Sequence, residues 1–232
     1  MRLVKGFGIV ALTLCTSSFA FAQDAAMPVK DGGIFAKGWA GKIDAQEEKA
    51  GANINQARLD EKGGTFTVRT GPATTYWNPA NKAMGSYTVS ATFNEPQYMN
   101  LMDHPHPYGI MIAGNDLGTE TQSFFYCAAY GNGTFIARGM GPAPFTAQAT
   151  RKPEPNAAIA KAAGKNAPVK QDIAVTVTAD KVECAINGTV VGSYNKADLV
   201  AAGKLKSTDG VYGIRFAHNT EATVTNFKMT KK

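Results

Sequence analysis

Along most of the chain after Gly64, apolar and polar residues alternate with a period of two. The clearest alternation covers 87–94, where every odd-numbered residue is apolar and every even-numbered residue is Thr, Ser or Asn. Since successive side chains of a strand point to opposite faces, this pattern predicts a strand with one buried face. Similar patterns predict further strands at 65–69, 108–112, 123–130, 134–138, 173–177, 182–186, 189–194, 212–216 and 222–229.

Short turns separate these strands. Asn187-Gly188 joins two of them, and a two-residue hairpin turn needs the positive φ that Asn and Gly tolerate. A Gly-Asn-Gly sequence at 131–133 joins another pair, and helix is scarce, with 198–202 as one candidate for a turn or two. Hairpins without long helices predict an all-β fold, an antiparallel two-sheet β-sandwich with little helix.

The domain organisation follows from length and composition. The chain has 232 residues, of which 44% are hydrophobic, and this suits one domain with a substantial core. We predict a flexible N-terminus at 23–34 and a single sandwich domain at 35–232. A Pro-, Lys- and Ala-rich stretch at about 143–171 is predicted to be a surface insertion, partly ordered at best. The sequence does not indicate the oligomeric state or the role of this insertion.

The first 22 residues have the pattern of a secretory signal peptide. Arg2 and Lys5 precede an apolar stretch at 7–14, and 20–22 is Ala-Phe-Ala, a small-residue cleavage site. The alternative, a lipoprotein acylated at Cys15, lacks the small residue wanted before the cysteine. No other apolar stretch approaches the roughly 20 residues of a transmembrane helix. We therefore predict an exported chain without a transmembrane segment, located in the periplasm or outside the cell.

The charge of the chain excludes one class of partner. Removing 1–22 takes away two basic residues and no acidic one, which lowers the formal net charge from +6 to +4. The lysine-rich stretches lack interleaved aromatic residues and match no nucleic-acid motif. We interpret these lysines as solvated surface side chains and predict no nucleic-acid partner.

Two cysteines, Cys127 and Cys184, remain after cleavage. Each alternates in phase with apolar neighbours, so both side chains can point into one core. An oxidising compartment allows a Cys127–Cys184 disulfide, and two buried free thiols are the alternative.

Two histidines are candidates for catalysis. His104 and His106 stand in a His-Pro-His-Pro sequence directly before the strand at 108–112. At this spacing both imidazoles can face one way in an extended segment, so they can bind a metal ion, or one of them can act as a base. Beyond Asp103, a third ligand is not apparent nearby in the sequence. The alternative is a proline-stiffened loop that carries two surface histidines.

A second candidate site follows the strand at 108–112. Asn115 and Asp116 lie there, with Glu120 further on, and oxygen atoms of such residues bind calcium in loops. A plain turn is the alternative. Calcium is the one cofactor that we consider, and no other is predicted.

Four residues are candidates for substrate binding. The rings of Tyr76 and Trp77 can stack on sugar faces, and core packing is the alternative for both. Arg138 and Arg215 stand at outward positions of their strands, where each can hydrogen-bond a sugar or a carboxylate. Solvated arginines are the alternative.

Six segments follow one another in the order typical of a known superfamily, namely 38–44, 85–93, 108–117, 182–191, 210–215 and 224–227. Over roughly residues 35–230 the chain resembles the concanavalin A-like, laminin G-like jelly-roll superfamily, and most nearly the secreted bacterial 3-keto-disaccharide hydrolase-type domains. The resemblance implies two stacked sheets with a carbohydrate ligand on one concave face or its rim loops. It implies a fold better than a function.

One departure from that superfamily bears on activity. Its glycoside hydrolases that cleave β-glucans carry a strand with paired carboxylates, whereas Glu183 stands alone in its strand here. We therefore predict a carbohydrate-associated sandwich that binds a glycan. A hydrolase or lyase acting on a disaccharide or its 3-keto form is one alternative, and a non-catalytic envelope or protein-binding domain is another. The sequence does not decide whether the chain is an enzyme.

Overall fold

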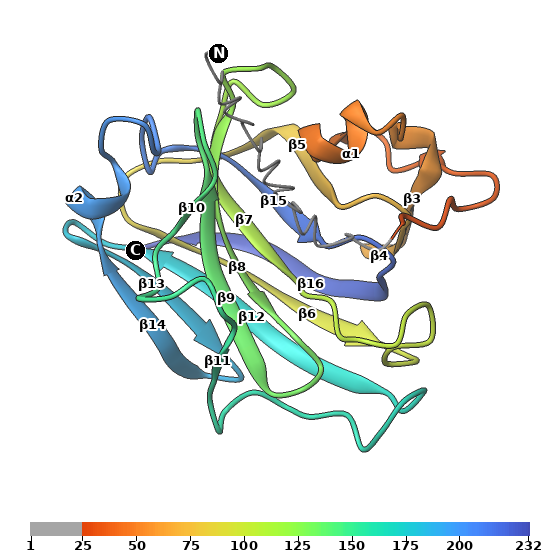
Figure 1. Ribbon diagram of the computed structural model, residues 1–232. Helices are drawn as coiled ribbons and strands as arrows, with labels where there is room; N and C mark the ends of the chain where they lie inside the picture. The colour runs from red at the N-terminus through yellow and green to blue at the C-terminus, as the bar shows by residue number, and fades with distance from the viewer. Residues whose placement is uncertain (1–24) are drawn as a thin grey trace, which may run out of the picture.

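The computed structural model describes residues 25–232, and its strands form two stacked sheets (Figure 1). The predicted signal peptide at 1–22 and the alternative lipid site at Cys15 lie outside the described residues. In spatial order, sheet A contains β1 (Gly33–Ile34), β3 (Ala57–Lys62), β4 (Thr65–Thr70), β16 (Glu221–Lys231), β6 (Tyr87–Glu95), β12 (Val169–Val177), β13 (Lys181–Ile186) and β14 (Thr189–Asn195). Sheet B contains β10 (Phe145–Thr146), β9 (Thr134–Met140), β8 (Ser123–Ala129), β7 (Tyr108–Asn115), β15 (Gly210–Phe216), β5 (Thr74–Ala83) and β2 (Ala40–Ile43), and β11 (Glu154–Pro155) pairs with β9. The helical elements are α1 (Ala45–Lys49), α2 (Lys196–Leu199) and the 3-10 turn η1 (Ile54–Gln56).

The strand pairing is antiparallel throughout the described residues, except for the parallel pair of β1 and β3. The last two strands complete both sheets, because β15 lies between β7 and β5 and β16 lies between β4 and β6. This arrangement confirms the predicted all-β, antiparallel two-sheet sandwich with little helix.

The main core fills the space between the sheets. In β6 the odd-numbered residues are buried and the even-numbered ones are half-buried, as the sequence alternation predicts. Phe93 of this strand packs against two rings of sheet B, with ring centroids 5.5 Å from Tyr108 and 6.0 Å from Phe216. Figure 1 shows β7, β8 and β9 crossing in front of β6, β12 and β16.

Sheet B is also covered on its outer face. Every residue of β8 is buried, so both faces of this strand are out of contact with water. A second apolar cluster lies on the outer face and consists of Trp77, Met111, Phe124, Tyr126, Ala128 and Ile136. Large side chains of sheet B therefore cover part of its own outer surface, and a hollow remains beside them.

A disulfide joins the two sheets. Cys127 of β8 and Cys184 of β13 are bonded, with their Cα atoms 5.9 Å apart. Both side chains are completely buried in the main core. Of the two alternatives that the sequence left open, the structure therefore has the disulfide and not two free thiols.

The stretch at 143–171 is more ordered than predicted. Gln148 is buried, and its side chain accepts a hydrogen bond from the backbone N–H of Ala137 and donates one to the carbonyl oxygen of Phe135. In this way an amide side chain pairs with β9 between the positions that β10 and β11 occupy. Gln171 belongs to β12 and binds the backbone N–H and carbonyl of Ala160. Glutamine side chains thus help to hold the stretch by hydrogen-bonding backbone N–H and C=O groups. Composition alone does not reveal such contacts.

The predicted boundaries of 23–34 and 35–232 stay a prediction, and the first strand begins near the boundary between them. Gly33 and Ile34 already form β1 of sheet A. The Asn219 side chain holds the preceding segment, since Oδ1 accepts from the N–H of Met27 and Nδ2 donates to the carbonyl of Ala25. Within residues 25–232, no helix has the length and apolar character needed to cross a membrane.

Candidate functional site

The candidate site is a hollow of about 330 Å³ on the outer face of sheet B. Strands β8, β9 and β15 supply its floor and one wall, and the segments before β7 and after β15 supply the opposite rim. We call it the Arg215 hollow. Its lining consists of Asp44, Ala73, His104, Pro105, His106, Pro107, Tyr126, Ala128, Tyr130, Ile136, Arg138, Arg215, Ala217 and His218.

Arg215 is fixed in one wall by three neighbours. Its Nη2 atom donates to Asp44 Oδ2 at 2.6 Å, and its Nη1 atom donates to Thr75 Oγ1 at 3.1 Å. The guanidinium carbon lies 5.6 Å from the centroid of the Tyr126 ring. Burial by itself lowers the pKa of Arg215, but the combined effects of Asp44, Tyr126 and Glu47 outweigh it and the pKa is raised. The hollow therefore contains a permanently charged donor whose orientation is set before any ligand arrives.

Arg138 and Tyr130 add polar groups to the same surface. Arg138 Nη2 donates to the carbonyl oxygen of Arg151 at 2.6 Å, while its buried Nε atom has no hydrogen-bond partner among residues 25–232. Burial raises the pKa of Tyr130 to about 12, so its hydroxyl keeps its proton at neutral pH and can donate it in a hydrogen bond. The Arg215 hollow thus combines guanidinium and phenol donors with the half-buried ring of Tyr130, whereas the Tyr126 ring is only 8% exposed.

Three imidazoles form the rim of the hollow. His104 Nε2 and His106 Nε2 are 2.9 Å apart, and the ring centroids of His106 and His218 are 4.2 Å apart. One nitrogen atom from each ring lies within 4.8 Å of the nitrogen atoms from the other two. Metal-binding side chains (His, Cys, Asp and Glu) converge in a group of three or more at this one place within the described residues, closely enough to hold a metal ion.

Each imidazole has a second polar neighbour outside the cluster. Asp103 Oδ1 lies 3.1 Å from His104 Nδ1, Glu47 Oε1 lies 3.8 Å from His218 Nδ1, and His106 hydrogen-bonds the backbone of Asn219. Burial, together with the charges of the two neighbouring histidines, lowers the pKa of His106 to about 3. His106 is therefore neutral at physiological pH.

Glu47 lies next to His218, and a backbone N–H group also holds its side chain. Its Oε2 atom accepts a hydrogen bond from the backbone N–H of Ala73 at 2.6 Å. Burial raises the pKa of Glu47, the Ala73 hydrogen bond lowers it, and the net shift is upward. The carboxylate of Glu47 is therefore engaged with the backbone and with His218.

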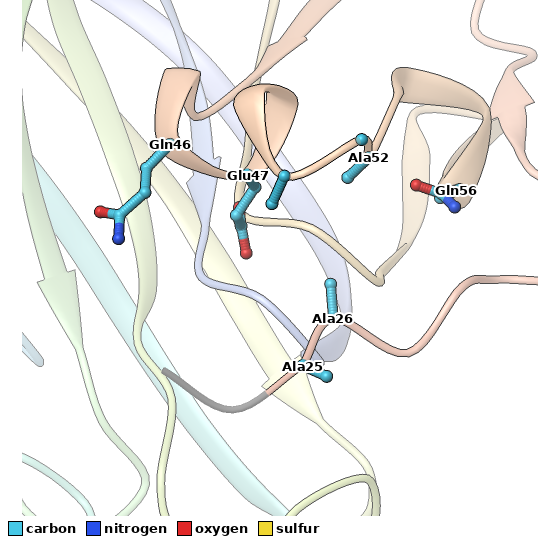
Figure 2. Close-up of a pocket in the computed structure, with 8 residues that line it drawn as sticks. Ala25, Ala26, Gln46, Glu47, Ala52 and Gln56 are labelled. Atoms are coloured by element: carbon cyan, nitrogen blue, oxygen red, sulfur yellow. The ribbon is translucent and has the colours of Figure 1, made fainter. Parts of the chain in front are cut away.

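A second hollow of about 370 Å³ lies on the other side of Glu47, between α1 and Ala25-Ala26 (Figure 2). Figure 2 shows the Glu47 side chain pointing from α1 toward Ala26. The polar side chains in this hollow are Gln46, Glu47 and Gln56, and the remainder of its lining is Ala and Gly. It offers neither an aromatic face nor a charged donor, so we take the Arg215 hollow as the candidate site.

Tyr76 and Trp77, predicted as sugar-stacking residues, do not line this hollow. They are neighbours in β5 and point to opposite faces of sheet B. Tyr76 is fully buried in the main core, so its ring offers no surface to a ligand. Trp77 lies on the outer face but is only 6% exposed, within the second apolar cluster. Both rings are therefore packed in apolar clusters and not on the surface of the hollow.

The predicted calcium ligands Asn115 and Asp116 do not converge on a cation site. Asn115 donates its amide to the carbonyl oxygens of Ala113 and Asp209. The carboxylate of Asp116 pairs with the ammonium group of Lys206, and Glu120 pairs with Lys42 at 3.6 Å. The two carboxylates therefore meet lysine ammonium groups in this structure, and the calcium site stays a prediction.

Of the other predicted site residues, Arg138, Arg215, His104 and His106 all line the Arg215 hollow. Sequence reasoning missed His218, Asp44, Tyr126 and Tyr130. One signal was available, because His218 is the third and last histidine of the chain. Its distance in sequence from His106 gave no reason to link the two.

No protein-family model matches the chain, and no curated protein matches its sequence. Among solved structures, it is similar to the carbohydrate-binding module CBM66 from Bacillus subtilis, with a TM-score of 0.55 and 7% identity over 86% of this chain and 99% of that one. It is also similar to a protein of unknown function with a galectin-like fold from Bacillus subtilis, with a TM-score of 0.54 and 13% identity over 83% and 89% of the two chains. At these identities the likeness shows the fold alone, a two-sheet jelly-roll sandwich.

Proposed function

We propose that this chain is an exported glycan-binding protein whose ligand occupies the Arg215 hollow. The observation that carries the proposal is the fixed guanidinium of Arg215 in the wall of a hollow that the half-buried ring of Tyr130 also lines. Arg138 and Tyr130 bring further donors to the same floor.

This combination suits a sugar for a physical reason. A pyranose or furanose ring has an apolar C–H face and a rim of hydroxyl groups, so it needs an aromatic surface together with directional donors. Arg215 has already lost its conformational freedom to Asp44 and Thr75. Binding therefore costs little side-chain entropy at this residue.

The charge of the hollow refines the ligand class. Asp44 pairs with Arg215, whereas the guanidinium of Arg138 donates to a backbone carbonyl and meets no carboxylate within residues 25–232. Arg138 therefore offers a charged donor that is not already held in an ion pair among these residues. A glycan that bears a carboxylate would form a charge-assisted hydrogen bond with Arg138, so we expect acidic sugars to bind more tightly than neutral ones.

The fold supports the proposal at a coarser level. The carbohydrate-binding module among the similar structures has the same sandwich, although at 7% identity its binding residues do not transfer to this chain. Export is part of the proposal and is supported by the signal-type sequence at 1–22. The Cys127–Cys184 disulfide also supports it, because such bonds persist in oxidising compartments.

Turnover of a disaccharide or its 3-keto form is the second candidate, and the histidine rim is the observation that favours it. Imidazoles near neutral pH accept and donate protons. Against ordinary glycoside hydrolysis, the carboxylates of Asp44 and Glu47 are engaged with Arg215 and with Ala73 N–H, respectively. Two carboxyl groups do not face each other across the hollow, so we place binding first.

The test is a titration of the purified chain, in the presence of a chelator, with neutral, acidic and 3-keto disaccharides, followed by proton NMR and calorimetry. We expect saturable binding without new anomeric signals. Arg138→Ala should raise the dissociation constant by about tenfold or more, because one charge-assisted contact is lost. The matched control is Arg69→Ala, which removes an arginine of β4 on sheet A that pairs with Glu221 at 3.8 Å.

Three results would contradict the proposal. New reducing-end signals would show turnover and support the hydrolase or lyase. Unchanged affinity in Arg138→Ala would place the glycan elsewhere. An absence of binding across the panel would exclude the sugars tested and favour a protein partner.

A further inference from the structure

All three histidines of this chain lie in one cluster. His104 and His106 come from the segment before β7, and His218 comes from the segment after β15. The two segments are far apart in the sequence, but β7 and β15 are neighbours in sheet B and pair Tyr108 with Phe216. The antiparallel pairing therefore brings the start of one strand and the end of the other to the same edge of the Arg215 hollow.

We propose that His104, His106 and His218 bind one divalent transition-metal ion, with Zn²⁺ as the best-matched ion, at the rim of the Arg215 hollow. This inference goes beyond glycan binding and does not depend on it.

The spacing of the nitrogen atoms fits one ion. In a tetrahedral site with Zn–N bonds of about 2.0–2.1 Å, two ligand nitrogens are separated by roughly 3.3 Å. Here the Nε2 atoms of His104 and His106 are 2.9 Å apart, and all three ligand nitrogens lie within 4.8 Å of one another. Small rotations of the imidazoles therefore bring three nitrogens to a common ion without a change in the backbone.

The outer polar contacts fit the same arrangement, two as hydrogen bonds and the Glu47–His218 pair as a 3.8 Å ion-pair contact. A histidine that ligates a metal usually has a carboxylate or a backbone carbonyl against its other ring nitrogen, which orients the ring. Asp103 stands against His104, Glu47 against His218, and the backbone of Asn219 against His106. Glu47 is itself held by the N–H of Ala73 at 2.6 Å. Each of the three rings thus has the outer partner that a metal ligand needs.

The donor atoms decide the class of ion. Imidazole nitrogens suit Zn²⁺ and its first-row neighbours, whereas Ca²⁺ and Mg²⁺ prefer oxygen ligands. The thiols of Cys127 and Cys184 are bonded to each other and do not compete as ligands. Three protein ligands are typical of zinc sites that keep a further coordination position open. All three histidines also line the Arg215 hollow, so a ligand in the hollow would lie close to the ion.

A cluster of hydrogen-bonded imidazoles without a metal is the competing explanation, since the 2.9 Å separation of two Nε2 atoms also suits a hydrogen bond. The test must therefore measure the ion itself. The full chain, purified with an affinity tag that contains no histidine, is stripped with a chelator, dialysed and titrated with Zn²⁺ by calorimetry and by competition with a chromophoric chelator. Co²⁺ is then substituted, and its visible absorption is recorded.

We expect one Zn²⁺ per chain with a dissociation constant below about 1 μM, and a Co²⁺ spectrum of four- or five-coordinate geometry. His218→Ala and His104→Gln should each weaken the affinity by at least about 100-fold, and Asp103→Asn by roughly tenfold, the range known for outer partners. The matched control is Asp116→Asn, which removes an exposed acid that pairs with Lys206 outside this hollow and should leave the affinity unchanged.

Two results would overturn the proposal: no saturable binding of Zn²⁺, or binding that keeps its stoichiometry and affinity in His104→Gln. Folding of each variant is checked by circular dichroism. If His218→Ala fails to fold, His104→Gln decides the question, because the side chain of His104 is 45% exposed and its replacement leaves the core intact. Since the sugar titration is run with chelator present, failure of the metal proposal and failure of the glycan proposal give separate results.

Discussion

The carboxylate of Asp44 lies 2.6 Å from Nη2 of Arg215, and this ion pair connects the end of β2 with β15 across β5. The side chain of Arg215 is 8% exposed and that of Asp44 is 28% exposed. The pair therefore holds the wall of the hollow together and sets the direction of a buried charge.

Asp44→Asn tests this pair. The change leaves the guanidinium of Arg215 buried without its counter-charge, which costs about 3 kcal/mol or more of unfolding free energy. Urea denaturation followed by circular dichroism measures the loss. The control is Asp60→Asn, because both side chains of the Arg58–Asp60 pair are more than a third exposed and its loss should change stability far less. Equal losses in the two variants would contradict the assigned role of Asp44.

Glu95 should make stability depend on pH. Burial raises the pKa of Glu95 from 4.5 to about 7. Between these values the unfolded chain has released the proton while the folded chain retains it, so stability falls as pH rises from about 4.5 to about 7 and is constant above.

Glu95→Gln removes this titration. Between about pH 4 and about pH 8, the unfolding free energy of the variant should therefore rise by roughly 2–3 kcal/mol relative to that of the parent. Comparing urea unfolding of the two proteins at both pH values cancels the titration of the histidines, which is common to both. A difference that does not change with pH would show that Glu95 has an ordinary pKa.

The Cys127–Cys184 bond should account for a large share of stability. It connects residues 57 positions apart, and the loss of loop-closure entropy in the unfolded chain corresponds to about 4 kcal/mol. Reducing the protein with a phosphine, and separately replacing both cysteines by alanine, should lower the urea midpoint by similar amounts. If reduction leaves the midpoint unchanged, the bond does not constrain the unfolded chain.

Gln148 should hold the stretch at 143–171 on sheet B. Gln148→Ala leaves the N–H of Ala137 without its side-chain acceptor, which costs about 1–3 kcal/mol. Hydrogen exchange by mass spectrometry should show faster exchange at Ala137, with little change in sheet A. Lys152→Ala, an exposed substitution in the same stretch, serves as the control and should leave exchange unaltered. Unaltered exchange in Gln148→Ala as well would mean that other contacts hold the stretch.

Export predicts a defined N-terminus. When the full-length chain is expressed with a secretion-competent host, the intact mass of the exported protein should correspond to a chain that begins at Gln23. Retention of 1–22 would contradict the signal-peptide assignment, and a lipid-modified N-terminus at Cys15 would support the lipoprotein alternative.

Much of the sheet structure was predictable because strand patterns are local. The alternation at 87–94 located β6, and the Asn187-Gly188 turn located the β13–β14 hairpin, since both depend on neighbouring residues alone. The same reasoning failed to assign a role to Tyr76 and Trp77. Alternation places them on opposite faces of β5, but β5 is an inner strand of sheet B with both faces covered, so neither ring stacks on a ligand.

By itself, the sequence determined the class of fold, the hairpins and two of the three histidines, because each of these is encoded within a short stretch of chain. Only the tertiary structure decided that His218 joins His104 and His106, that Asp44 pairs with Arg215, and that Cys127 is bonded to Cys184. These contacts depend on which strands become neighbours, here β15 beside β7 and β8 opposite β13. Strand order reflects the packing of the whole chain, and a local pattern of polar and apolar residues does not record it.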